Sequence, residues 1–269
     1  GIENGYVIGK ELSRLEEFYN MGARYMTLAH NGHNDICDSS GPLARLGDVE
    51  EEHGGVSNFG YQVIDEMNRV GMMVDISHVS IKCMMQATKY SKAPVIASHS
   101  GVWELAKHSR NLNDEQLMAI GAAGGVVQIV GLNSFVKFYP DKGSEISIIR
   151  NAAALAAGDK EWDSSKHNSD PIYIAAMDII DKKYPAATVK DFVDHIDYAV
   201  NLIGVEHVGI VSDFDGGGGI EGWNDASETM NVTAELISRG YSEEDISKIW
   251  SENTIALWRR VDAAAADIQ

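Results

Sequence analysis

The sequence is poor in cysteine, which limits its disulfide and metal chemistry. Only Cys37 and Cys83 occur in 269 residues, so a framework of several disulfides is excluded and a single disulfide is left open. Neither cysteine stands in a CxxC motif or another zinc-type spacing. A metal site, if there is one, must therefore use other ligands.

Basic residues are also scarce. There are 22 lysines and arginines against 40 aspartates and glutamates, which gives a formal net charge of −18. A field of this sign repels nucleic-acid phosphates and anionic lipid headgroups. The composition therefore predicts no nucleic-acid partner and no membrane contact by this chain.

Long apolar runs are missing as well. No stretch approaches the roughly 20 apolar residues that span a bilayer. The first residues, GIENGYVIGKE, lack the apolar centre of a signal peptide. The chain opens with Gly1 rather than Met, in what reads as the end of a strand followed by a turn. We therefore expect an N-terminal segment of the same protein to precede it, and the compartment stays open.

What the sequence does contain is the pattern of one large α/β domain. Hydrophobic residues make up 44% of the chain, enough for a substantial core. Short β-branched runs alternate with longer amphipathic stretches, as in βα units around a parallel sheet. No linker or internal repeat divides residues 1–269, so we predict a single domain. The predicted strands are 25–29, 72–77, 94–98, 126–130 and 208–212.

Several helix starts carry a capping pattern, in which a side-chain acceptor precedes a polar partner by three residues. The region between Pro140 and Pro185 is less regular, and DKEWDSSKHNSDP indicates an exposed loop between two helical pieces. The three capping pairs are Asn113 with Gln116, Thr188 with Asp191, and Ser242 with Asp245.

Periodicity alone leaves open whether the βα units close into a barrel or form a doubly wound sheet. Polar residues at the strand ends favour the barrel, whose chemistry sits at the carboxyl ends of its strands. His30, His78, His99 and Asp213 each follow a predicted strand, and Glu3 stands at the start of the chain. A lone histidine there is usually structural, but repetition at successive strand ends favours a site for a cation such as Zn²⁺.

The remaining acidic and histidine motifs are weaker candidates. Asp213 lies nearest the strand end in SDFDG and could move a proton for a metal-bound water, whereas Asp215 reads as a turn residue before the four glycines 216–219. His33 and Asp35 form an HxD pair, but their Gly- and Asn-rich surroundings indicate a loop. We expect surface or core roles for the histidines at 53, 108, 167, 195 and 207.

Several blocks of the sequence resemble the membrane (renal) dipeptidase family, zinc-dependent metallopeptidases of the amidohydrolase superfamily. The resemblance runs from the first residue to about residue 262, and the DISHVS and SHS pair is close to a family signature. The matching blocks are GIENG, RYMTLAHN, GYQVIDEMNRVGMMVDISHVS, APVIASHSGVWELAKHSRN, VGIVSDFDG and SENTIALWRRV.

The resemblance implies a (β/α)₈ barrel whose first two βα units, roughly 100 residues or more, lie before Gly1. It also implies a metal site with two Zn²⁺ ions, in which Glu3 bridges the ions while His78 and His99 bind one of them. The family's other ligands, a His-x-Asp pair on the first strand, would belong to the N-terminal segment. Members often form homodimers, for which the composition offers no independent argument.

The resemblance further implies hydrolysis of dipeptides by a zinc-bound hydroxide. His30 would steady the oxyanion, Arg110 would hold the free C-terminal carboxylate, and Asp213 would handle the proton. Phe135 stands near a position where some members have tyrosine, so one hydroxyl contact to the substrate is expected to be absent. Two alternatives stay open: a related hydrolase of another amide, lactam or ester, and a non-catalytic barrel that lacks one metal site.

Overall fold

A parallel β-sheet forms the centre of the protein. The computed structural model describes residues 1–268, and in this range the strands lie in sequence order with every neighbouring pair parallel. All five predicted strands are confirmed, with ends that shift by up to two residues. They are β1 (Tyr25–Thr27), β2 (Met73–Asp75), β3 (Ile96–Ser100), β4 (Val126–Val130) and β5 (Val208–Val211).

The strand order decides between the two architectures that the periodicity left open. A doubly wound sheet reverses its order at a switch point, whereas a (β/α)₈ barrel keeps its parallel strands in consecutive order. The order here is consecutive and parallel, so the α/β fold is of the barrel class. The start of the chain extends this series, because Ile2 forms a parallel bridge with Met26 of β1.

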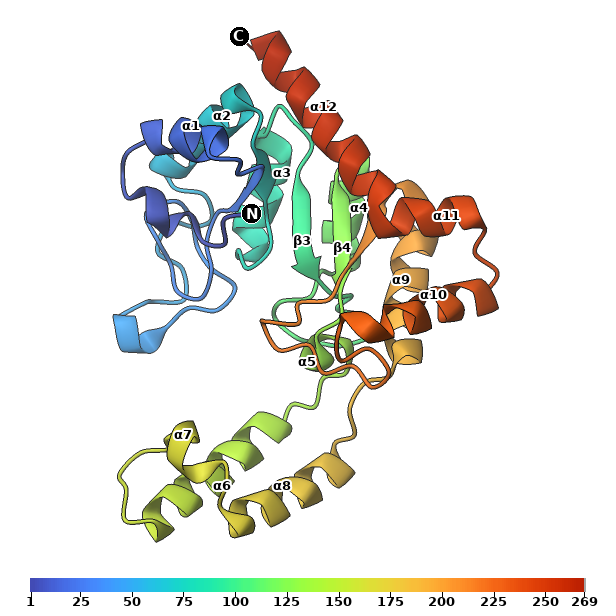
Figure 1. Cartoon of the computed structure of the whole chain (residues 1–269). Helices are drawn as coiled ribbons and strands as arrows, with labels where there is room; N and C mark the ends of the chain where they lie inside the picture. Colours follow the sequence, from blue (N-terminus) through green and yellow to red (C-terminus); the bar gives the residue numbers. More distant parts are fainter. Residues whose placement is uncertain (269) are drawn as a thin grey trace.

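Helices follow the strands and cover the sheet (Figure 1). The capping boxes predicted at Asn113, Thr188 and Ser242 are all confirmed. The helices of this part are α1 (Ser13–Asn20), α2 (Asn58–Val70), α3 (Ile81–Tyr90), α4 (Asp114–Ala122), α5 (Asn133–Val136), α9 (Val189–Ile203), α10 (Thr229–Ser238), α11 (Glu243–Ser247) and α12 (Asn253–Ile268). Short turns of helix are η1 (Gly5–Ile8), η2 (Ala44–Leu46), η3 (Val205–His207), η4 (Ala226–Glu228) and η5 (Lys248–Glu252).

Each strand presents alternate residues to opposite faces of the sheet. On one face, α2, α3, α4 and α9 contribute to the large apolar core. On the other face, Met73, Ile96 and Val126 form a smaller apolar cluster with Leu257 and Val261 of α12. Helix α12 therefore closes the amino-terminal part of that second face, and polar side chains occupy the part nearer the strand ends.

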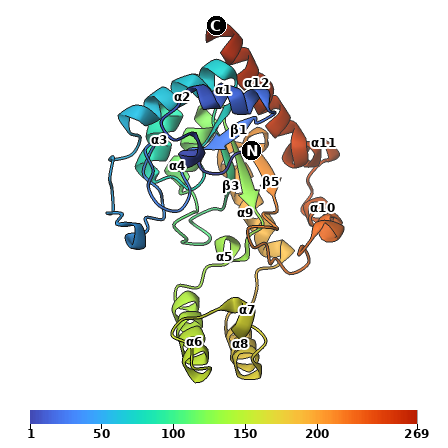
Figure 2. The same cartoon turned by 60° about the vertical axis from the view of Figure 1, so that its left-hand side comes forward.

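A helical hairpin extends away from the rest of the molecule, past the carboxyl ends of β3 and β4 (Figures 1 and 2). It consists of α6 (Lys142–Ala156), α7 (Ser164–His167) and α8 (Pro171–Lys183). Glu145 ties its two long helices together by accepting bonds from Lys183 at 2.7 Å and Tyr184 at 2.8 Å. The predicted loop between the two helical pieces contains the short α7. Over residues 1–268, no helix combines the length and apolarity needed to cross a bilayer.

Candidate metal centre

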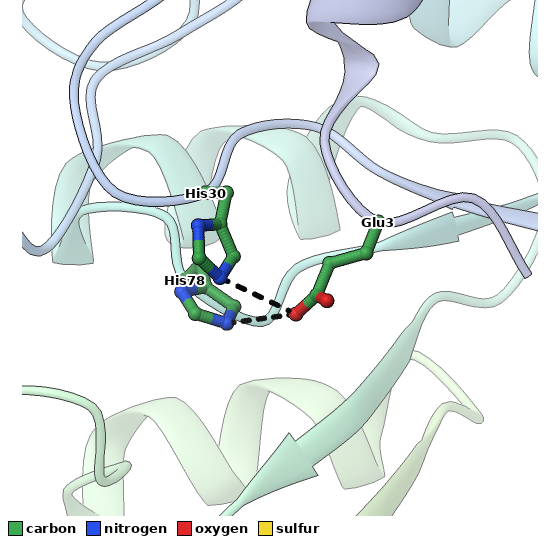
Figure 3. Close-up of side chains that lie close together, drawn as sticks. All are labelled: Glu3, His30 and His78. Atoms are coloured by element: carbon green, nitrogen blue, oxygen red, sulfur yellow. Dashed lines mark ion pairs between the residues drawn. The ribbon is translucent and has the colours of Figure 1, made fainter. Parts of the chain in front are cut away.

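Three imidazoles converge on one carboxylate oxygen at the carboxyl end of the sheet. The Nε2 atom of His78 lies 3.1 Å from Oε1 of Glu3, that of His99 lies 3.3 Å away, and that of His30 lies 3.6 Å away. Figure 3 shows Glu3 directed at His30 and His78 from a different segment of the chain. The structure thus brings together four residues that are up to 96 positions apart in the sequence.

The parallel sheet accounts for this convergence. Glu3 follows the bridge between Ile2 and β1, His30 and His78 follow β1 and β2, and His99 lies within β3. Carboxyl ends of neighbouring parallel strands meet at one end of the sheet, so their side chains share one space. His78 adopts a left-handed backbone conformation, with φ of 65°, which is uncommon outside glycine and frequent at functional sites.

The donor set fits a divalent metal ion. One ligand atom each from Glu3, His30 and His78 lies within 4.8 Å of the others, and His99 approaches the same glutamate oxygen. Imidazole nitrogen and carboxylate oxygen are the ligands that Zn²⁺ and neighbouring transition metals accept. Geometry alone offers both His30 and His99 as further nitrogen ligands beside Glu3 and His78.

The environment keeps the buried imidazoles in the neutral form that binds metals. Burial lowers the pKa of His78 far below its ordinary value, and the nearby Arg110 cation lowers it further. Burial also lowers the pKa of His99, against an opposing attraction to the Asp75 carboxylate. Both rings therefore present a lone pair at neutral pH.

Arg110 lies beside this cluster with an unused hydrogen-bond donor. Its side chain is buried, and one terminal nitrogen donates to the carbonyl oxygen of His99 at 3.2 Å. Its Nε atom has no partner among residues 1–268. Burial lowers the pKa of Arg110 to about 10, against the attraction of Asp75, Glu3 and Asp213. The guanidinium thus stays charged at neutral pH and keeps a donor for an anion.

Asp213 lies at the other end of the strand order, two residues after the last residue of β5. Its backbone is left-handed, with φ of 53°, and its carbonyl accepts from Gly216 at 3.1 Å and Gly218 at 3.0 Å. A Cβ atom on Gly216 would lie only 2.3 Å from Oδ1 of Asp213. A larger residue at 216 would therefore displace the Asp213 side chain. The Asp213 carboxylate is close enough to the cluster to act to raise the pKa of His99 and of Arg110, against the effect of burial.

Comparison with known proteins establishes the family to which this chain belongs. The family model of the membrane dipeptidases (peptidase family M19) matches residues 1–269. The chain belongs to this family. The prediction from the DISHVS and SHS blocks is thereby confirmed.

Two curated relatives show how much of a similar protein the chain represents. The dipeptidase tcpJ of Claviceps purpurea is 34% identical over 267 residues, which cover 99% of this chain and 51% of that protein. The dipeptidase aclJ of Aspergillus oryzae is 32% identical over 269 residues, which cover 100% of this chain and 52% of that protein. The chain spans about half the length of these relatives.

A solved structure agrees in fold. The crystal structure of the probable dipeptidase PvdM from Pseudomonas aeruginosa matches with a TM-score of 0.83 and 36% sequence identity. The match covers 98% of this chain and 68% of that chain. The barrel-class fold inferred from the strand order is therefore shared with a structure related in sequence.

Other motifs of the sequence have structural roles in this member of the dipeptidase family. The ring of His33 accepts from the backbone of Ser39 at 2.9 Å and donates to the carbonyl of Val49 at 2.8 Å. Asp35 forms an exposed ion pair with Lys10 at 2.9 Å. His33 thus holds the loop after β1 through two hydrogen bonds, and Asp35 forms a surface ion pair. Within the described chain, both cysteines are buried and unpaired.

Sequence reasoning singled out Phe135 only for a missing hydroxyl contact to the substrate and gave His108 a surface or core role, and it missed that both lie against Arg110. The ring of His108 accepts a hydrogen bond from the Arg110 backbone at 3.2 Å and stacks 4.4 Å from the ring of Phe135. Phe135 itself lies 5.3 Å from the guanidinium carbon of Arg110, a cation–π distance. A hint was present in AKHSRN, where His108 and Arg110 are separated by one residue.

Asp75 was missed as well, although its signal was stronger. It is the one acidic residue in the apolar run GMMVDIS before His78, and it is fully buried. A buried carboxylate needs hydrogen-bond partners to offset its desolvation. The position of Asp75 within an apolar run could therefore have indicated a buried carboxylate with a structural or functional role.

Burial of histidines predicts that the metal-free protein loses stability in acid. The pKa values of His78, His99, His108 and His195 are all lowered, chiefly by burial. Below pH about 6.5 these histidines bind more protons in the unfolded chain than in the folded chain. The free energy of unfolding therefore falls as pH falls. Each such histidine contributes at most about 1.4 kcal/mol per pH unit, and less near pH 6.5, where the unfolded histidine is half protonated. Urea unfolding between pH 7.5 and 5.5 measures the slope.

The variant His195→Gln serves as the control for this slope. His195 lies away from the metal centre, where its ring accepts from Val102 at 3.0 Å and donates to the carbonyl of Val136 at 3.0 Å. Its replacement should make the free energy of unfolding fall less steeply with pH, by at most about 1.4 kcal/mol per pH unit. Stability that does not change between pH 7.5 and 5.5 would contradict the prediction.

Proposed function

We propose that the protein is a zinc-dependent dipeptidase that hydrolyses dipeptides with a free C-terminal carboxylate. The observation that carries the proposal is the convergence of three imidazoles on Glu3 beside the buried Arg110, whose Nε atom has no partner among the described residues. Membership of a dipeptidase family supports peptide-bond hydrolysis by the whole protein.

The metal ligands proposed in this chain are Glu3, His78 and His99. Glu3 would bridge two Zn²⁺ ions, and the two buried imidazoles would bind one of them, as their neutral form allows. Bound zinc supplies Lewis acidity, which polarises a carbonyl and makes a bound water more acidic. The remaining steps fall to side chains that surround the centre.

His30 is the member of the cluster best placed to face the substrate. Its side chain is 36% exposed, against 9% for His78 and 13% for His99. An N–H group at the open edge of the centre can donate to the oxyanion that forms when the carbonyl is attacked. We therefore assign His30 to oxyanion stabilisation, although its distance to Glu3 would also suit a ligand.

Arg110 and Asp213 complete the assignment. Arg110 would bind the substrate carboxylate through its free donor, which limits the substrate to one residue beyond the cleaved bond. Asp213 would take the proton of the attacking water and deliver it to the leaving amine. An N-terminal segment of the same protein would complete the site, and a homodimer remains an expectation from the family.

A substrate panel with metal analysis tests the proposal. The full-length protein, loaded with zinc, should bind two zinc ions and cleave dipeptides but not their C-terminally amidated forms, and a chelator should abolish cleavage. Equal rates on free and amidated dipeptides would contradict the carboxylate requirement. Preference for a lactam or ester would point to another hydrolase, and fewer than two zinc ions without hydrolysis would point to a non-catalytic barrel.

A further inference from the structure

A layer of buried polar side chains lies directly beneath the metal centre. Thr27, Asp75 and Ser98 stand two residues after Tyr25, Met73 and Ile96. Met73 and Ile96 belong to the apolar cluster under α12, and Tyr25 packs against it. Strand alternation places residues two apart on the same face. Thr27 and Asp75 have no exposed surface and Ser98 is 6% exposed.

Asp75 is the acceptor at the centre of this layer. Its Oδ1 atom accepts from the backbone N–H groups of Ser77 at 3.0 Å and Ser98 at 2.9 Å. Its Oδ2 atom accepts from the hydroxyl of Thr27 and from the hydroxyl of Ser98 at 2.6 Å. Because the carboxylate only accepts, both hydroxyls must donate to it.

The hydrogen bond from Ser98 to Asp75 determines how Ser98 can bind the His99 ring. The hydroxyl of Ser98 lies 2.8 Å from Nδ1 of the His99 ring. Its proton is committed to Asp75, so its oxygen can only accept, and Nδ1 must carry the hydrogen. The lone pair is then on Nε2, the atom that faces Glu3. The backbone of His99 also donates to the hydroxyl of Ser77 at 3.0 Å.

We propose that Asp75, acting through Ser98, is a positioning residue that fixes the ring orientation and tautomer of His99. The inference rests on the proposed role of His99 as a metal ligand. His78 lacks such an arrangement, because its buried Nδ1 atom has no partner among the described residues. Outer partners of metal-binding histidines commonly contribute 10- to 100-fold in metal affinity.

The variants Asp75→Asn and Ser98→Ala test the proposal in the full-length protein. In Asp75→Asn, the amide oxygen must accept from the two backbone N–H groups, so the amide N–H₂ faces the hydroxyls. Ser98 then accepts from the amide and donates to Nδ1, which moves the His99 proton to Nε2. In Ser98→Ala, Nδ1 loses its partner and both tautomers become populated.

Two measurements follow, and neither depends on activity. Imidazole nitrogen NMR of the metal-free protein should show His99 as the Nδ1–H form in the wild type, as the Nε2–H form in Asp75→Asn and as a mixture in Ser98→Ala. Competition with a chelator should show zinc binding that is about 10- to 100-fold weaker in both variants.

Thr27→Val is the matched control. It removes a hydroxyl from the same Oδ2 atom of Asp75 without touching His99, so the tautomer and zinc affinity should stay close to those of the wild type. An unchanged His99 tautomer with zinc affinity within about 2-fold in folded Asp75→Asn and Ser98→Ala would overturn the positioning role. Absence of zinc binding in the wild type would instead contradict the proposed function.

Discussion

Replacing Glu3 with glutamine is expected to remove metal binding and nearly all hydrolysis. A neutral amide cannot bridge two cations, and its N–H₂ group can donate to the imidazole nitrogens that converge on Oε1. We expect kcat/KM to fall by about 1000-fold or more, equivalent to about 4 kcal/mol of transition-state stabilisation. Zinc content and dipeptide hydrolysis of the full-length variant provide the measurement.

Glu11→Gln is the control for this substitution. Glu11 is an exposed glutamate near the start of the chain, and its carboxylate pairs with Arg14 at 3.0 Å. Exposed ion pairs of this kind contribute little to stability, so the control should match the wild type in zinc content and rate. A Glu3→Gln variant that retained both zinc ions and activity within about 3-fold of the wild type would contradict the proposed bridge.

Arg110→Met is expected to weaken substrate binding far more than it slows turnover. The methionine side chain can fill much of the buried space of the arginine stem, but it leaves the substrate carboxylate without its cationic partner. Removing one member of a buried charge pair costs about 2 to 5 kcal/mol, so kcat/KM for free dipeptides should fall by about 30- to 4000-fold, mainly through KM.

The selectivity of the variant is more informative than its rate. Amidated dipeptides carry no carboxylate, so their low kcat/KM should be similar in the wild type and in Arg110→Met. Arg14→Met, which alters only the exposed pair with Glu11, is the control. A variant that lost activity equally on free and amidated substrates would show that Arg110 acts on folding or on the metal centre rather than on the carboxylate.

The predicted strands illustrate what a local pattern can establish. Runs such as VVQIV at 126–130 alternate apolar side chains over the length of a strand, and β4 begins and ends at these residues. The capping box at Asn113 is also complete within four residues. Such features depend on neighbours in the sequence, so the sequence alone predicts them.

The candidate site was predictable only in part. His78 and His99 stood out because each follows an apolar run, and the family resemblance supplied roles for Glu3, His30 and Arg110. The sequence grouped His30 with the other strand-end candidates, but it did not indicate that His30 approaches Glu3 almost as closely as His99 does. This approach depends on the loop after β1 and on side-chain rotamers, which periodicity does not describe.

By itself, the sequence determined the α/β class and the strands, because these follow from short-range patterns, and its resemblance to the family supplied the proposed roles of the candidate site residues. Tertiary structure alone decided that the strands are consecutive and parallel, and that Thr27, Asp75 and Ser98 share one buried layer. It also decided that Phe135 lies against Arg110. The physical reason is that these contacts join distant segments, and strand order, register and backbone turns such as that at His78 set which side chains meet.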